Sequence, residues 1–447
     1  MRDSGLGRAF FFVWAGIRVF DPQWMKSMNT CHRNLDGLEN HVFFISTTMK
    51  LFHGLELAYC TNVHRGNSWE ETFDSLNRYV LAVREKVEPE KRFAVGLRLG
   101  ADAARELSAP EQITQFQKWL EAKNCYVFTI NGFPYGNFHG QRVKEEVYRP
   151  DWSSKERLRY TVQLFEILEK LLQPGEEGSV STLPGSFKEF HPEGTIHPDI
   201  LENLLLCSDE IDRIQRMKNL DLHLGLEPEP LGLFETTPET ISFFEKLKEK
   251  GKARESLLRN VGVNYDCCHL AVEFEEAEEG LSALEQAEIR LSKLHLSSAL
   301  RVTPSPENLK SLAHFVEEVY LHQVVVGQGG KVVRRYKDLD LAIDSVALGK
   351  DSPGEEWRVH FHVPLHASPG NGMEDTKDHV SKTLDWLSRN PGKCRHLEME
   401  TYTWEVLPEN LRTLKVVDQV AEEYFWTLNA LRERGLAPDI RRTIQGG

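Results

Sequence analysis

The chain has no excess of positive charge. Its 447 residues carry 54 Lys and Arg against 68 Asp and Glu, a formal net charge of −14. Proteins that follow nucleic-acid phosphates depend on clustered Lys and Arg, so this balance argues against a nucleic-acid partner. Cysteines are also few: the seven are scattered, their number is odd, and no two have the CxxC spacing. This pattern argues against a disulfide framework and favours a reduced, cytoplasmic setting.

Long apolar runs are absent as well. The apolar stretch 9–20 has only twelve residues and contains Arg18, which is too short to span a bilayer, so we predict no membrane insertion. No small-x-small cleavage site follows it, which argues against a signal peptide. We interpret residues 1–48 as an N-terminal extension that is either disordered or the product of a misassigned start codon. Residues 49–440 are predicted to form a single domain.

From residue 50 onward, short apolar runs alternate with stretches of helical period. The predicted strands span residues 55–60, 93–99, 126–131, 179–183, 222–227, 261–266, 291–296, 359–363 and 396–400. Helical stretches between them cover 69–87, 111–122, 154–172, 238–250 and 375–388. This alternation predicts a parallel sheet. Because no dinucleotide-binding glycine fingerprint is present, it favours a closed (β/α)₈ TIM barrel over a doubly wound sheet.

A barrel has eight strands, and nine stretches compete for those places. Residues 323–336 also have the pattern of a hairpin around Gly327-Gln-Gly-Gly330. We therefore interpret 302–390 as an enlarged insertion before the last barrel strand, with a small sheet of its own.

Polar residues stand where the later strands end. These residues are Glu227, Glu229, Asp266, His269, His295, Arg301, Glu398 and Glu400. In a TIM barrel the carboxyl ends of the strands meet at one face, where unpaired acids would repel one another without a cation. We predict a divalent cation held by Glu229, Asp266, His295 and Glu400. This hard, mostly oxygen donor set prefers Mn²⁺ or Mg²⁺ and is compatible with Zn²⁺.

The same residues resemble the pattern of the xylose-isomerase-like TIM barrels, especially the ketose 3-epimerases. The resemblance implies that Asp266 and His295 bind the metal, while His269 and Arg301 contact substrate oxygens. The first ligand is ambiguous between Glu227 and Glu229. Glu229 is favoured because Glu235, which corresponds to a substrate-contacting residue, follows six positions later.

Two further alternatives stay open. Glu398 lies on the same face of its strand as Glu400, two residues earlier, and so competes with it as the last ligand. The inserted segment contains His360-Phe-His362. Either His362 takes the place of His295, or this segment adds a second set of ligands, somewhat as in relatives of endonuclease IV.

A closer resemblance covers most of the chain from residue 49. Residues 60–64 (CTNVH), 181–188 (STLPGSFK), 226–230 (LEPEP) and 400–404 (ETYTW) resemble the Ebo-cluster E proteins, called metabolite-traffic proteins. That resemblance implies the same barrel superfamily, a secondary-metabolite precursor as the bound molecule, and partner proteins encoded in the same operon.

Three functions are compatible with these observations. The first is an isomerase or epimerase of a polyhydroxylated carbonyl compound, in which Glu229 and Glu400 move protons on opposite faces of the substrate. Asn62, His64 and Lys188, which also follow strands, are predicted to line its pocket. The second is a carrier that binds a cyclitol or a secondary-metabolite precursor without turnover. The third, a nuclease of the endonuclease IV type, is disfavoured by the negative charge.

Overall fold

The computed structural model describes residues 51–136, 142–191, 195–409 and 411–438. The predicted N-terminal extension, residues 1–48, lies outside the described residues. Among the described residues, no helix is both long enough and apolar enough to cross a membrane. The six cysteines in this part of the chain are buried free thiols.

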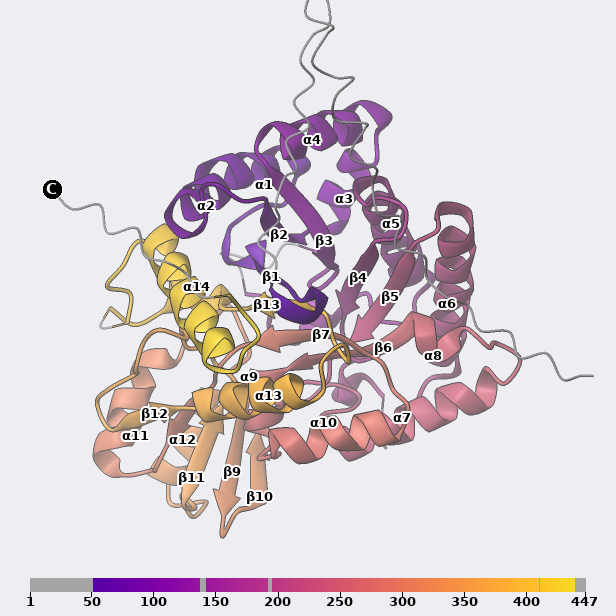
Figure 1. Ribbon diagram of the computed structural model, residues 1–447. Coiled ribbons are helices and arrows are strands. Elements are labelled where there is room, and N and C mark those ends of the chain that lie inside the picture. The colour runs from indigo at the N-terminus through magenta and orange to yellow at the C-terminus, as the bar shows by residue number, and fades with distance from the viewer. Residues whose placement is uncertain (1–50, 137–141, 192–194, 410, 439–447) are drawn as a thin grey trace, which may run out of the picture. The chain divides into compact units, whose positions relative to one another are not determined.

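Eight parallel strands form the barrel (Figure 1). Their order around the sheet is β1-β13-β7-β6-β5-β4-β3-β2, and a parallel bridge between Cys60 and Gly96 joins the two ends. The strands are β1 (Glu56–Tyr59), β2 (Phe93–Arg98), β3 (Cys125–Asn131), β4 (Glu177–Thr182), β5 (Asp221–Leu226), β6 (Val261–Asp266), β7 (Leu291–Leu296) and β13 (His396–Met399). The predicted TIM barrel is therefore confirmed.

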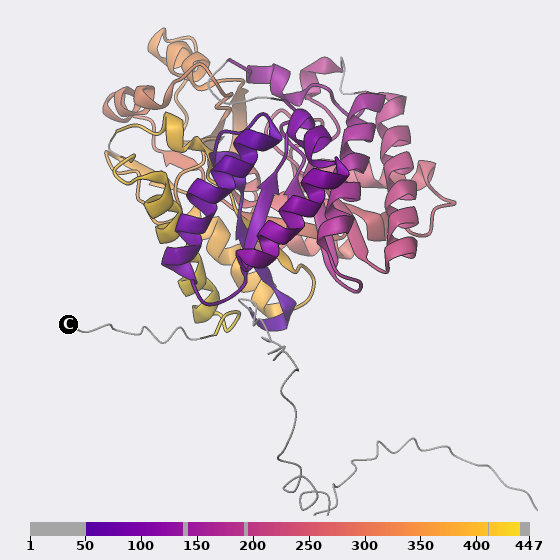
Figure 2. The same cartoon turned by 90° about the horizontal axis from the view of Figure 1, so that it is seen from above.

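Helices surround this sheet on its outer face (Figures 1 and 2). They are α1 (Trp69–Ser75), α2 (Leu81–Val87), α3 (Ala101–Leu107), α4 (Pro110–Ala122), α5 (Lys155–Leu171), α6 (Pro198–Lys218), α7 (Thr237–Lys250), α8 (Leu257–Asn260), α9 (Cys267–Val272), α10 (Ala277–Gln286), α13 (Lys377–Arg389) and α14 (Val416–Glu433). A π-helical turn, Leu76–Val80, joins α1 to α2. Their apolar faces and the outward residues of the strands form one large core.

Local sequence explains where these elements begin and end. The Thr236 side chain caps α7 by accepting a hydrogen bond from the Glu239 N–H, and Pro238 occupies the first turn. Every residue of β6 and β7 is buried. Strands covered on both faces have this property, because the barrel interior lies on one side and the helices on the other.

The insertion forms a second sheet, which is antiparallel and has the order β10-β9-β11-β8-β12. Its strands are β8 (Leu300–Val302), β9 (Val324–Gln328), β10 (Lys331–Tyr336), β11 (Glu356–Val359) and β12 (Met373–Asp375), accompanied by α11 (Pro306–Leu312) and α12 (Leu339–Ala347). The predicted hairpin is β9–β10. The ninth predicted strand, 359–363, is not a barrel strand: β11 pairs within this small sheet, and 360–363 continues without strand structure.

Candidate metal centre at the barrel mouth

Strand register brings the central side chains to one level of the barrel. His295 on β7 pairs with Asp266 at the end of β6 on one side and with Glu398 on β13 on the other. Glu227 and Glu400 each follow directly after the last residue of a strand, β5 and β13 respectively. All five side chains are buried. The carboxyl ends of four neighbouring strands, β13, β7, β6 and β5, therefore bring these groups to one point.

Three carboxylates surround one nitrogen of His295. Its Nδ1 lies 3.0 Å from Glu227 Oε1, 3.1 Å from Glu400 Oε2 and 3.4 Å from Asp266 Oδ2. One donor atom from each of these four residues lies within 4.8 Å of the other three. We call Glu227, Asp266, His295 and Glu400 the mouth group. Three carboxylate oxygens and one imidazole nitrogen form a donor set of the kind that binds Mn²⁺, Mg²⁺ or Zn²⁺.

Glu398 lies one layer deeper in the barrel and orients His295. Its Oε2 is 3.1 Å from His295 Nε2 and accepts a 2.6 Å hydrogen bond from Lys293 Nζ, while Oε1 accepts from Asn131 Nδ2 at 2.9 Å. Burial alone would raise the pKa of Glu398, but Lys293 and His295 outweigh it and lower the pKa to about 2. The charged Glu398 thus holds Nε2 and turns Nδ1 toward the other acids, as second-layer carboxylates do at metal-binding histidines.

The electrostatics of the mouth group fit a cation. Burial lowers the pKa of His295, yet Glu400 and Glu227 outweigh burial and raise it well above its ordinary value. The three carboxylates therefore stabilise positive charge at Nδ1. A divalent cation held by the same atoms would satisfy this preference more fully than one proton does.

Glu229 occupies a different position from the one predicted. The mouth group contains Glu227, the alternative first ligand, whereas Glu229 lies in the wall of the pocket above it. Burial, followed by repulsion from Glu227, raises the pKa of Glu229 well above its usual range. The neighbouring Tyr148 hydroxyl offsets part of this rise. Between the two glutamates, the Pro228 carbonyl accepts a hydrogen bond from His269 Nδ1 at 3.1 Å.

The mouth group opens into a pocket with about 690 Å³ of empty space, which includes space open to solvent. The barrel and the insertion both contribute to its lining: Asn62, Asn131, Phe133, Pro134, Val143, Lys144, Val147, Tyr148, Glu227, Glu229, His269, Tyr320, Leu321, Gln323, His360, Glu400 and Tyr402. Two residues predicted to contact substrate are among them, Asn62 and His269. Asn62 also donates a 2.8 Å hydrogen bond to Glu400 Oε1 and so orients that carboxylate.

Four other residues predicted to contact substrate do not line this pocket. Arg301 lies on β8 of the small sheet, where its side chain pairs with Glu374 at 3.1 Å. Lys188 and Glu235 form an ion pair with each other. His64 stacks on Tyr79, with ring centroids 4.4 Å apart, and lines a separate cleft. These contacts occupy the four side chains outside the pocket lining, so their placement lends no support to their predicted roles.

Two histidines of the inserted segment approach the mouth, although neither joins the mouth group. His362 Nδ1 donates to the Glu400 backbone oxygen at 2.7 Å. The histidine of the mouth group is His295 and not His362. His360 lines the pocket. Sequence reasoning also missed Lys293, although it has the same strand parity as His295 and so faces the barrel interior with it. Tyr148 and Gln323 follow no strand end, so no signal marked them.

No protein-family model matches the chain, and no curated protein matches its sequence. Its structure is similar to several solved ones. The probable 3-DHS dehydratase AsbF of Bacillus anthracis is 12% identical, with a TM-score of 0.44 over 84% of this chain and 98% of that one. A xylose isomerase domain protein from Planctomyces limnophilus is 13% identical, with a TM-score of 0.43 over 79% and 92%. D-allulose 3-epimerase from Methylomonas sp., solved with D-allulose, is 11% identical, with a TM-score of 0.42 over 87% and 99%.

Proposed function

We propose that this chain is a metal-dependent isomerase or epimerase acting on a polyhydroxylated carbonyl compound. The observation that carries the proposal is the mouth group, in which three carboxylates meet His295 Nδ1 at 3.0–3.4 Å below a pocket that holds a further buried carboxyl, Glu229. Glu227, Asp266, His295 and Glu400 would hold the divalent cation. The cation would polarise a carbonyl and its neighbouring hydroxyl, which makes the intervening C–H more acidic.

The chain's own residues supply the proton transfers. Glu400 lines the pocket and its orientation is set by Asn62. In this proposal Glu400 accepts the proton from the substrate carbon, and Glu229, a buried carboxyl of the pocket whose pKa is raised, delivers a proton to the product. His269, which donates from Nδ1 to the Pro228 carbonyl and lines the pocket, would hydrogen-bond a substrate hydroxyl through Nε2. Ketoses and cyclitols are candidate substrates, and the resemblance to the Ebo-cluster E proteins adds a secondary-metabolite precursor.

Solvent exchange tests this function. The Mn²⁺-loaded full chain is incubated in deuterated water with a panel of ketoses and cyclitols, and deuterium uptake is followed by mass spectrometry. We expect carbon-bound deuterium in at least one compound and its isomer. Binding of such a compound without any exchange would overturn the proposal and identify a carrier instead.

The role of Glu229 is tested with the substrate found in this way. Because general acid–base groups contribute about 10²- to 10⁴-fold to rate, we expect Glu229→Gln to lower kcat by that range and leave Mn²⁺ binding intact. Glu245→Gln, an exposed carboxylate on α7, is the matched control and should leave kcat unchanged. Unchanged turnover in Glu229→Gln would contradict the role assigned to this side chain.

A further inference from the structure

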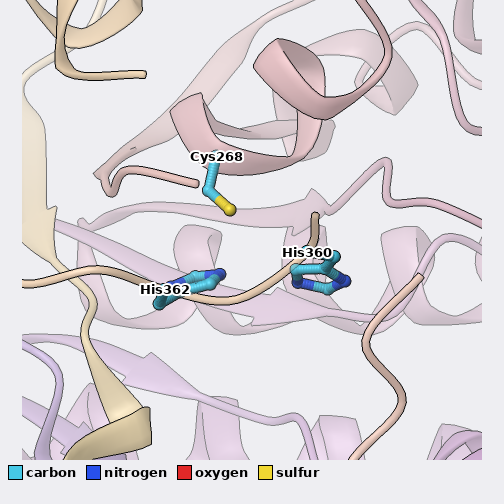
Figure 3. Close-up of side chains that lie close together, drawn as sticks. All are labelled: Cys268, His360 and His362. Atoms are coloured by element: carbon cyan, nitrogen blue, oxygen red, sulfur yellow. The ribbon is translucent and has the colours of Figure 1, made fainter. Parts of the chain in front are cut away.

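A second set of buried donors lies beside the mouth group. The set consists of Cys268, His360 and His362, each of which offers one donor atom, and these atoms lie within 4.8 Å of one another. All three residues are buried. Cys268 is in the first turn of α9, while the histidines belong to the segment that follows β11. Figure 3 shows the thiol pointing toward the gap between the two imidazole rings.

Hydrogen bonds set the orientation of both rings. His362 Nδ1 lies 2.7 Å from the Glu400 carbonyl oxygen, which can only accept, so Nδ1 carries the proton. His360 Nδ1 lies 2.8 Å from Gln323 Oε1. The orientation of Gln323 is fixed in turn, because its Nε2 donates to the Pro230 carbonyl at 3.0 Å. His360 therefore also carries its proton on Nδ1, and the Nε2 atom of each ring has a free lone pair.

Neither lone pair is used within the protein. His360 Nε2 and His362 Nε2 are buried and have no hydrogen-bond partner among the described residues. Leaving a buried polar atom without a partner costs about 1–3 kcal/mol, so the two Nε2 atoms are candidates to bind a ligand. A ring that donates from Nδ1 to an oxygen and presents Nε2 has the usual arrangement of a metal-binding histidine.

We propose that Cys268, His360 and His362 form a second cation site, of the Zn²⁺ type, next to the mouth group. A thiol and two imidazoles are softer donors than the carboxylates of the mouth group, and they favour Zn²⁺ over Mg²⁺ or Mn²⁺. Binding breaks the S–H bond of Cys268 and forms a sulfur–metal bond, and the proton passes to solvent. The proposal goes beyond the proposed function, because the cation binds whether or not a substrate turns over.

Two contacts connect this site to the mouth group. His362 shares a second group of nearby donors with Asp266 and His269, and Asp266 is itself a member of the mouth group. His362 also holds the backbone of Glu400. His360 lines the pocket, so a cation held by three protein donors would keep its remaining coordination position on the pocket side, as catalytic zinc sites do. The resulting centre has one oxygen-rich position and one sulfur- and nitrogen-rich position.

Cobalt absorption tests the second site without relying on activity. The metal-free full chain is titrated with Co²⁺, and the thiolate-to-Co²⁺ charge-transfer band is recorded. We expect the band in the wild type and its disappearance when Zn²⁺ is added. Cys268→Ser should abolish the band, and His362→Gln should weaken Co²⁺ binding at this site by at least about 100-fold, because even an outer-layer change costs 10- to 100-fold.

The neighbouring cysteine provides a matched control. The Cys267 thiol is directed toward Thr383 Oγ1 at 3.6 Å, so Cys267→Ser should keep the band. His295→Gln should remove binding at the mouth group and also keep the band, which separates the two sites. A folded wild-type chain that binds Co²⁺ without a thiolate band, or a band that persists in Cys268→Ser, would overturn the proposal. Neither result would bear on solvent exchange into a substrate.

Discussion

At the residue scale, the candidate metal centre consists of charged side chains at two depths along β7 and at the end of β13. Glu400 and His295 belong to the upper level, while Glu398 and Lys293 lie below and are fully buried. The lower pair does not reach the pocket. Glu398 orients His295 by contacting its Nε2. The position of His295 Nδ1 in the mouth group therefore depends on a charged side chain that does not line the pocket.

Glu398→Gln tests this dependence. The substitution leaves Lys293 as an uncompensated buried charge, which we expect to cost about 3–5 kcal/mol in the free energy of unfolding, measured by urea denaturation. It should also weaken Mn²⁺ binding about 10- to 100-fold, measured by calorimetry. The double variant Lys293→Met/Glu398→Gln should regain much of the stability but not the affinity. Full affinity in either variant would contradict the orienting role.

Gly96 lies so close to the Glu398 carboxylate that there is no room for a side chain at this position. A Cβ at this position would lie 1.8 Å from Glu398 Oε1 and 2.6 Å from the Tyr59 backbone oxygen, which cannot move aside. We expect Gly96→Ala to destabilise the fold by about 1–3 kcal/mol, since overpacking of this kind forces backbone shifts. Gly136→Ala is the control, because nothing lies within 4 Å of its added Cβ. Equal melting temperatures for the two variants would contradict the predicted steric clash at residue 96.

At the scale of the element, α13 is attached to the barrel by a buried histidine. His379 stacks on Tyr265 of β6, with ring centroids 6.0 Å apart, and its Nε2 accepts the Tyr265 hydroxyl at 2.9 Å. Burial, followed by repulsion from Arg358, lowers the pKa of His379 to about 4. The histidine therefore supports α13 in its neutral form.

This predicts a defined dependence of stability on pH. Between pH 6.5 and about 4 the unfolded chain binds a proton at residue 379 that the folded chain does not. Stability from this group is therefore complete above pH 6.5 and falls by up to about 3 kcal/mol as the pH drops to 4. His379→Gln should flatten that part of the profile in urea denaturation. His314→Gln, at an exposed histidine, should keep the slope, and a slope unchanged in His379→Gln would refute the assignment.

The sequence predicts part of the geometry that these elements give to the site. The Asp-x-x-His spacing of Asp266 and His269 marks the end of β6 and the start of α9, and alternation along β7 directs His295 inward. The sequence could not show how deep a side chain lies along the barrel axis. Glu398 and Glu400 share a face of the chain and differ only in that depth. Glu227 and Glu229 are also two residues apart, and the sequence could not show that Glu227 is the one that joins the mouth group.

At the scale of the whole molecule, the barrel follows from the alternation of strands and helices, whereas the pocket does not. Gln323 and His360 line the pocket because they stand directly beside the ends of β9 and β11, in the antiparallel sheet inserted between β7 and β13. That placement depends on pairing between segments far apart in the chain, such as β8 with β11, and local periodicity carries no information about it. Arg301 belongs to the same sheet and does not line the pocket.

The central claim is that Glu227, Asp266, His295 and Glu400 hold a divalent cation. The most direct measurement is electron paramagnetic resonance of Mn²⁺ titrated into the metal-free full chain, compared between the wild type and the variants Glu227→Gln, Glu229→Gln and His295→Gln. We expect tight Mn²⁺ binding in the wild type and in Glu229→Gln, and its loss in Glu227→Gln and His295→Gln. Mn²⁺ bound equally by the wild type and by His295→Gln would contradict the account.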